Sequence, residues 1–283
     1  MAKLLLGAEV TAALNEDLRR RTAVLEEKGI QPTLAILRVG EDPSDLSYER
    51  GAIKRAGLVG VTVKQYALPG DVSPEEMLAR IDLLNADDSI HGVLMLRPLP
   101  AHLKKWEDTI CNRLDPKKDM DGMTRISQAG VFAGQNLGYP PCTPAACMEI
   151  LEHYGIDCTG KSVAVIGRSM VVGKPVAMML MGKNATVTVC HTKTRDTAAV
   201  CRNADIVVTA AGALGSFTKE FVRPGQVVID VAINWDEKKG GIAGDARFEE
   251  VEPVVAAITP VPGGVGSVTT SVLMKHVVEA AEK

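Results

Sequence analysis

The chain has 283 residues, which is enough for two domains and a large buried core. Its formal net charge of −3 gives no electrostatic reason to expect a nucleic-acid or membrane partner. No apolar run reaches the length of a membrane span.

The N-terminus is faintly similar to a secretion signal, but its apolar core is too short and Glu9 follows at once. We therefore expect a cytoplasmic protein. The six cysteines include no Cys-x-x-Cys pair, and the five histidines are scattered along the chain. This pattern predicts reduced, buried thiols and no metal site.

Strand and helix patterns alternate along the whole chain, which predicts an α/β fold with mostly parallel sheets. In the first half, apolar runs predict strands at 33–39, 61–67 and 92–96, the last of which is stopped by Pro98.

Helix-start signals follow two of these strands. Asp42 or Ser44 could cap a helix that carries Tyr48. Ser73, followed by a proline and two glutamates, predicts the start of another helix.

Residues 138–144 are rich in glycine and proline and predict a hinge into the second half. That half again alternates strands and helices and ends in a helix over about 268–282. Its strands are expected near 163–166, 185–189, 205–210 and 226–231.

The stretch from Val163 to Pro175 carries the strongest functional signal. Its first residues predict a buried parallel strand, Gly167 permits a sharp turn, and Gly173 opens a helix. Such a junction presents free backbone N–H groups and the positive end of a helix dipole to a dinucleotide pyrophosphate. The spacing is G-x-S-x-x-x-G and not the usual G-x-G-x-x-G, so an ordinary strand-to-helix turn is the alternative.

The residues after the next strand favour NADP over NAD. An NAD site usually carries an acid about 20 residues past the first glycine, but here no acid comes before Asp196. The chain offers Thr192 with Lys193 or Arg195, and Arg168 in the phosphate loop. A hydroxyl and cations suit a 2′-phosphate, whereas the alternative is a solvated basic loop.

Several separate motifs are spread over the chain. They are Asp119-Met-Asp-Gly122, Pro141-Cys-Thr-Pro144, Gly167-Arg-Ser169 with Val172-Gly173, Ala185-Thr-Val-Thr-Val-Cys-His191, Gly244-Asp245 and Thr259-Pro-Val-Pro-Gly-Gly-Val-Gly266. In these motifs and in their order, the chain resembles the methylenetetrahydrofolate dehydrogenase/cyclohydrolase family over nearly its whole length. Several motifs in the right order are far more specific than one glycine loop.

This resemblance implies two α/β domains that flank a cleft for the folate substrate, and a homodimer. The N-terminal folate domain would comprise residues 1–138 plus 267–283. The Rossmann-like NAD(P)-binding domain would comprise residues 139–266.

The resemblance also assigns roles to single residues. By position, Tyr48 would stack on the folate rings and Asp121 would hydrogen-bond the pterin edge, and both would act in catalysis with Lys54. Taken alone, Tyr48 would be a half-buried helix aromatic, and Asp119 and Asp121 would be turn residues. The implied folate-binding residues are Tyr48, Leu96, Asp121, Pro262 and Gly263, and the implied cofactor-binding residues are Gly167, Arg168, Ser169, Gly173, Thr192 and Ile233.

Two polar positions of the family's cyclohydrolase step are apolar here. Where the family pattern has a lysine four residues after the tyrosine, this chain has Ala52. Lys54 lies about 120° round the helix from Tyr48. Where the family pattern has a glutamine before the proline-rich strand end, this chain has Leu96. Arg97 lies on the other side of the strand. Since water addition needs proton transfers, we expect hydride transfer from methylenetetrahydrofolate to NADP to far exceed hydrolysis.

Two alternatives to this interpretation stay open. The first is a fully bifunctional enzyme in which Lys54 or Arg97 reaches the site by another path. The second is a non-catalytic folate- or dinucleotide-binding regulator.

Overall fold

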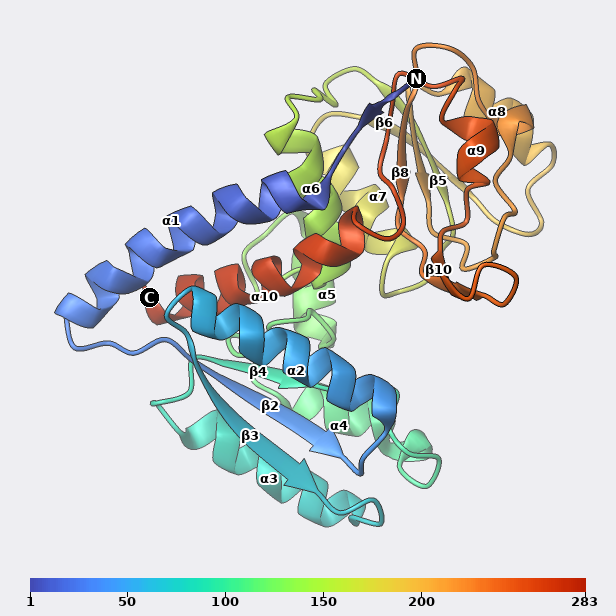
Figure 1. Cartoon of the computed structure of the whole chain (residues 1–283). Helices are drawn as coiled ribbons and strands as arrows, with labels where there is room; N and C mark the ends of the chain where they lie inside the picture. The colour runs from blue at the N-terminus through green and yellow to red at the C-terminus, as the bar shows by residue number, and fades with distance from the viewer. The chain divides into compact units, whose positions relative to one another are not determined.

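The computed structural model describes residues 1–283, and the chain folds into two compact units (Figure 1). The N-terminal unit comprises residues 13–142 and 270–283, and the C-terminal unit comprises residues 1–12 and 143–269. The first twelve residues, which we expected in the folate domain, group with the C-terminal unit because Lys3 and Leu4 pair with its last strand. The two-domain α/β fold expected from the sequence is confirmed.

The C-terminal unit is built on a six-stranded, wholly parallel sheet in the order β1-β11-β8-β7-β5-β6. Its central strands are buried apolar runs, as expected of a parallel sheet covered on both faces. The strands are β1 (Lys3–Leu4), β5 (Ser162–Ile166), β6 (Thr186–Cys190), β7 (Ile206–Thr209), β8 (Val227–Asp230) and β11 (Ala257–Ile258).

Helices and one hairpin connect these strands. The antiparallel hairpin of β9 (Asn234–Asp236) and β10 (Gly241–Ala243) was not expected from the sequence, because its strands are short and partly polar. The helices are α6 (Cys142–His153), α7 (Gly173–Gly182), α8 (Thr197–Asn203), η2 (Lys219–Phe221) and α9 (Phe248–Val251). The boundaries between the two units fall within α1 (Gly7–Glu27), at the start of α6 and within α10 (Val265–Ala281).

The N-terminal unit holds a three-stranded parallel sheet in the order β3-β2-β4. Figure 1 shows α2 and α3 on opposite faces of this sheet. Its strands are β2 (Thr33–Val39), β3 (Thr62–Leu68) and β4 (Gly92–Met95), and its helices are α2 (Pro43–Leu58), α3 (Pro74–Ala86), η1 (Lys104–Trp106), α4 (Glu107–Arg113) and α5 (Arg125–Ala133).

Alternation along β2 builds the two faces of this sheet. Ala35, Leu37 and Val39 belong to one buried cluster with residues of α3 and α4. Leu34 and Ile36 point to the other face and are fully buried. None of the helices combines the length and the apolar composition that a membrane crossing requires.

The expected helix caps are present. The Asp42 carboxylate accepts the Ser44 backbone N–H at 2.8 Å and begins α2, so Asp42, and not Ser44, is the cap. Ser73 and Glu76 form a reciprocal capping box at the start of α3.

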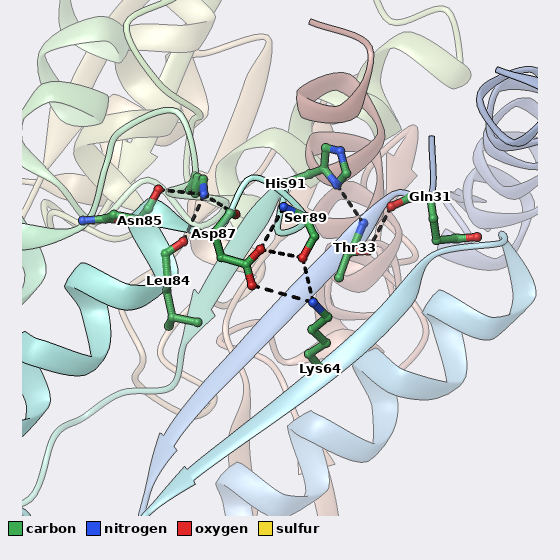
Figure 2. Close-up of polar contacts among 9 residues, drawn as sticks. Gln31, Thr33, Lys64, Leu84, Asn85, Asp87, Ser89 and His91 are labelled. Carbon is green, nitrogen blue, oxygen red and sulfur yellow. Dashed lines mark hydrogen bonds and ion pairs between the residues drawn. The ribbon is translucent and has the colours of Figure 1, made fainter. Parts of the chain in front are cut away.

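Polar contacts surround the amino ends of the three strands (Figure 2). The Thr33 N–H donates to His91 Nδ1 at 3.2 Å, and burial lowers the pKa of His91, which keeps this nitrogen available as an acceptor. Lys64 Nζ donates to Ser89 Oγ at 2.8 Å and lies 3.7 Å from the Asp87 carboxylate. These contacts tie β3 to the turn before β4.

Lys118 closes the carboxyl end of α3. Its ammonium donates to the backbone carbonyls of Leu84, Asn85 and Asp87 at 3.0, 2.9 and 2.8 Å. The last carbonyls of a helix have no partner within the helix, so a cation there satisfies them and offsets the negative end of the helix dipole.

Replacement of Lys118 by methionine should therefore destabilise the fold by about 2 kcal/mol, since hydrogen bonds from a charged donor are lost while the stem is kept. Urea unfolding would measure this change. Lys117→Met at the exposed neighbouring position is the matched control and should have little effect. Equal stability of the two variants would contradict the prediction.

Candidate functional site

A cavity of about 440 Å³ lies at the carboxyl ends of β5 and β7 in the C-terminal unit. From β5 the chain passes to β6 on one side and then to β7 on the other, so this is the topological switch point of the sheet, where open α/β sheets bind ligands. The lining residues are Ile166, Gly167, Arg168, Ser169, His191, Thr192, Thr197, Ala210, Ala211, Ala213, Ser216, Phe217 and Phe221.

The two expected glycines are required where they stand. Gly167 has φ of +121°, and a Cβ on it would lie 2.3 Å from the carbonyl oxygen of Ala210. A Cβ on Gly173 would lie 2.3 Å from the carbonyl oxygen of Gly167. The end of β5 can therefore approach both the residue after β7 and the start of α7 closely only without these side chains.

Ser169 occupies part of the helix start that we expected to be free. Its Oγ accepts the N–H of Val172 at 3.1 Å and of Gly173 at 3.4 Å. The Ser169 carbonyl also accepts the N–H of Lys174 at 3.0 Å. A bound anion at this turn would therefore meet the Ser169 hydroxyl and fewer bare N–H groups than a plain strand–turn–helix offers.

No carboxylate lines the cavity, whereas Arg168 and Thr192 both do. The nearest acid in sequence, Asp196, is the cap of α8 and accepts the Ala199 N–H at 3.0 Å. Apolar walls, a cation, hydroxyls and a tight glycine turn fit a dinucleotide with phosphate groups. Four of the expected residues are not among the lining ones: Gly173, Lys193, Arg195 and Ile233, the last of which is 63% exposed on the loop after β8.

In the N-terminal unit, the carboxylate of Asp121 has Cys142 and Arg97 as polar neighbours. Its carboxylate accepts the Cys142 N–H at 3.0 Å. Burial raises the pKa of Asp121, while the hydrogen bonds from Cys142 and the positive charge of Arg97 oppose this rise. A carboxylate that is buried but paired with only one backbone donor keeps the capacity to accept further N–H groups.

Asp119 has a different role, although it is only two residues away. Its carboxylate is fully buried and accepts the N–H groups of Met123 and Thr124 and the hydroxyl of Ser127, at 3.1, 2.8 and 2.7 Å. These bonds hold the turn that leads into α5. Asp119 is therefore the turn residue of the pair.

His276 supports this segment from α10. Its Nδ1 donates to the Met120 carbonyl at 2.8 Å, and its ring lies 5.0 Å from the ring of Tyr139. The Cys142 thiol donates to the same carbonyl at 3.3 Å, because burial raises the thiol's pKa and keeps it protonated. No local pattern in the sequence pointed to His276, since its contacts come from distant parts of the chain.

The two apolar replacements are both buried. Ala52 lies on the inner face of α2 and Leu96 is 7% exposed after β4. Lys54 is exposed on the same helix, and Tyr48 is about one-third exposed. On α2, therefore, Ala52 is buried, whereas Tyr48 and Lys54 both reach the surface.

The two loop residues expected to contact folate, Pro262 and Gly263, lie between β11 and α10 in the C-terminal unit. Gly263 has φ of +102°, and its carbonyl accepts the Gly7 N–H at 2.8 Å. The left-handed backbone there explains the need for glycine.

Comparison with known proteins covers both units. Residues 5–121 match the catalytic-domain model of tetrahydrofolate dehydrogenase/cyclohydrolase, and residues 141–283 match its NAD(P)-binding-domain model. A "Bifunctional protein FolD" of Carboxydothermus hydrogenoformans is 48% identical over 283 residues, which cover 100% of this chain and 98% of the relative. The chain belongs to the tetrahydrofolate dehydrogenase/cyclohydrolase family.

Solved members of this family share the fold closely. The bifunctional FolD enzyme of Campylobacter jejuni has a TM-score of 0.96 and 39% identity, covering 100% of this chain and 99% of that one. The Trypanosoma brucei enzyme, solved with NADP cofactor and an inhibitor, has a TM-score of 0.91 and 34% identity, covering 99% and 97%. The cavity at the switch point therefore lies in the family's NAD(P)-binding domain.

The buried imidazole of His276 predicts a pH dependence of stability. Burial lowers its pKa to about 4, helped by nearby Lys275 and Lys283 and opposed by the bond to Met120. The unfolded chain takes up this proton below about pH 6.5, while the folded chain refuses it until about pH 4. This group therefore costs stability as the pH falls through that window, by roughly 2–3 kcal/mol at pH 4.5.

Urea unfolding of the wild type and of His276→Asn at pH 7.5 and pH 4.5 would test this. Asparagine can still donate to the Met120 carbonyl but does not titrate, so the variant should lose less stability on acidification. Equal losses in both proteins would contradict the neutral buried histidine.

Proposed function

We propose that the chain oxidises 5,10-methylenetetrahydrofolate to 5,10-methenyltetrahydrofolate with NADP as hydride acceptor, and that its cyclohydrolase activity is weak. Membership of the family supports the folate substrate and the dinucleotide. The preference for NADP and the weak second activity rest on this chain's own residues.

The chemistry of the first step asks little of protein side chains. The substrate carries a CH₂ group between two nitrogens, and a nitrogen lone pair can expel hydride from it to leave a stabilised amidinium cation. When bound, the nicotinamide accepts that hydride. The protein has to hold the two reactants in line and close together, so the binding residues are also the catalytic ones. We assign Tyr48 to stacking and Asp121 to the pterin edge.

The observation that carries the choice of NADP is the lining of the switch-point cavity. Arg168 and Thr192 lie there and no carboxylate does. A guanidinium and a hydroxyl can bind a 2′-phosphate, whereas a carboxylate would repel it and favour a free ribose hydroxyl. The Trypanosoma brucei enzyme, which was solved with NADP as its cofactor, supports the same choice.

The weak cyclohydrolase rests on Ala52 and Leu96. Water must add to the methenyl carbon, and protons must leave and arrive. Two buried apolar side chains can neither orient that water nor relay a proton. Lys54, which we also considered for catalysis, is exposed on another face of α2.

A fully bifunctional enzyme is the second candidate. The relatives' description as bifunctional favours it. Arg97 also lies close enough to Asp121 for its charge to lower the carboxyl pKa, so a cation is present near that acid.

We further propose a cytoplasmic homodimer. Ile233, Trp235 and Ile242 gather on and beside the β9–β10 hairpin and are 63%, 66% and 46% exposed. A cluster of large apolar side chains on a hairpin suits a protein interface. The six unpaired cysteines suit a reducing compartment.

Replacement of Arg168 by alanine should raise the KM for NADP by roughly 10- to 150-fold, because one charge-assisted contact is lost. The KM for NAD should change little, which steady-state assays with each cofactor would show. Lys161→Ala, an exposed cation just before β5, is the control. A wild-type enzyme that uses NAD as well as NADP would overturn the assignment.

Restoration of both polar residues, Ala52→Lys with Leu96→Gln, should raise hydrolysis of methenyltetrahydrofolate. The single changes should do less, since the groups act as a unit and a lone buried lysine costs desolvation. Decay of the methenyl absorbance, corrected for the buffer rate, measures the step. Robust hydrolysis by the wild type that Lys54→Ala abolishes would show that Lys54 performs it.

A further inference from the structure

Asp245 places a carboxylate in the interior of the C-terminal unit, next to the loop that follows β7. The residue is fully buried. Its Oδ2 accepts the Thr209 hydroxyl at 3.0 Å and the backbone N–H groups of Ala211 and Gly212 at 2.7 and 3.3 Å. One oxygen thus gathers three donors from four consecutive residues.

The other carboxylate oxygen of Asp245 also accepts hydrogen bonds, and we call the whole set of bonds to the two oxygens the clamp. Oδ1 accepts the Ala213 N–H at 2.7 Å and the side-chain amide of Asn234, on β9, at 3.2 Å. No lysine or arginine forms an ion pair with Asp245. Its buried charge is therefore balanced by five neutral donors, and four of the five come from residues 209–213.

The clamped loop forms part of the switch-point cavity. Ala211 and Ala213, whose N–H groups bond to Asp245, line the cavity together with Arg168 and Ser169. These two backbone positions are fixed by the carboxylate, and not by a helix or a strand, since β7 ends at Thr209. The wall of the cavity therefore depends on one side chain that does not line it.

We propose that Asp245 is a positioning residue for the cofactor: it holds the loop 210–213 in the shape that the dinucleotide needs. This inference rests on the proposed use of the cavity for NADP. Three backbone N–H groups of this loop donate to the Asp245 carboxylate. Without that carboxylate they would lack a hydrogen-bond acceptor, and the loop would move into the cavity or out to water.

Asp245 is itself held in place by a second acid. The N–H groups of Asp245 and Ala246 donate to the Asp230 carboxylate at 3.2 and 2.9 Å. A Cβ at Gly244 would lie 2.0 Å from Asp230 Oδ2, so only glycine permits this approach. The two residues of the Gly244-Asp245 pair thus have separate functions. Gly244 permits close packing against Asp230, and Asp245 holds the loop that follows β7.

The test replaces Asp245 by asparagine, which keeps the shape of the side chain. Whichever oxygen becomes NH₂, it then faces N–H donors, so part of the clamp is lost. Direct titration should give NADP binding about 10- to 100-fold weaker than in the wild type. The KM for the folate substrate should stay within about twofold. Asp236→Asn on the hairpin, where the acid accepts only local N–H groups, is the matched control.

Thermal unfolding with and without NADP separates a positioning role from a purely structural one. Saturating NADP should raise the Tm of the wild type and of Asp236→Asn, and should raise that of Asp245→Asn much less. A variant with a lower Tm but an unchanged NADP affinity would overturn the proposal, because the carboxylate would then serve only folding.

Thr209→Val provides a milder change should Asp245→Asn fail to fold. It removes one donor to the carboxylate without changing volume, and it should weaken NADP binding by about 2- to 10-fold. Unchanged binding in this variant would count against the clamp. A wild type that binds neither dinucleotide would overturn the proposed function itself, whereas normal binding by both wild type and Asp245→Asn would overturn only this inference.

Discussion

A negative charge buried without a cation holds several segments of the C-terminal unit together. Asp245 is fully buried, and its carboxylate is stabilised by hydrogen bonds from neutral backbone and side-chain donors alone. Such an arrangement is stable only if each donor stays in place, because a lost hydrogen bond to a buried charge is costly. The loop after β7, the hairpin and the segment that bears Asp245 are consequently fixed with respect to one another.

The N-terminal unit uses the same device and shows how two neighbouring acids diverge. Asp119 accepts three donors from the turn that follows it, so its oxygens are committed to the fold. Asp121 accepts one backbone N–H and keeps accepting capacity. The count of donors already bound, and not the residue type, separates a structural carboxylate from one that can bind a ligand.

Much of the fold could be predicted because the signals are local. The apolar run 33–39 coincides with β2, and the caps at Asp42 and Ser73 act within three residues of themselves. The G-x-S-x-x-x-G spacing placed the turn after β5 correctly, since it depends only on where a Cβ cannot fit. Long-range features were missed: the short hairpin β9–β10, the pairing of the N-terminus with β11, and the bond from His276 to Met120.

The site shows the same limit. Gly167, Arg168, Ser169 and Thr192 line one cavity, as their spacing in the sequence suggested. The sequence also offered the pair Gly244-Asp245 as a motif without a role. That role depends on contacts more than thirty residues away in the chain, which no periodicity reports.

The amide of Asn234 gives Asp245 one further consequence. Asn234 lies on the hairpin, between the exposed residues Ile233 and Trp235. Its amide donates to the Asp245 carboxylate, which also binds the loop that lines the cavity. A contact that shifts the hairpin and a dinucleotide that orders the loop thus act on the same carboxylate, and both Asn234 and Ala213 donate to its Oδ1. By thermodynamic reciprocity, if association through the hairpin tightens dinucleotide binding by some factor, the dinucleotide tightens that association by the same factor.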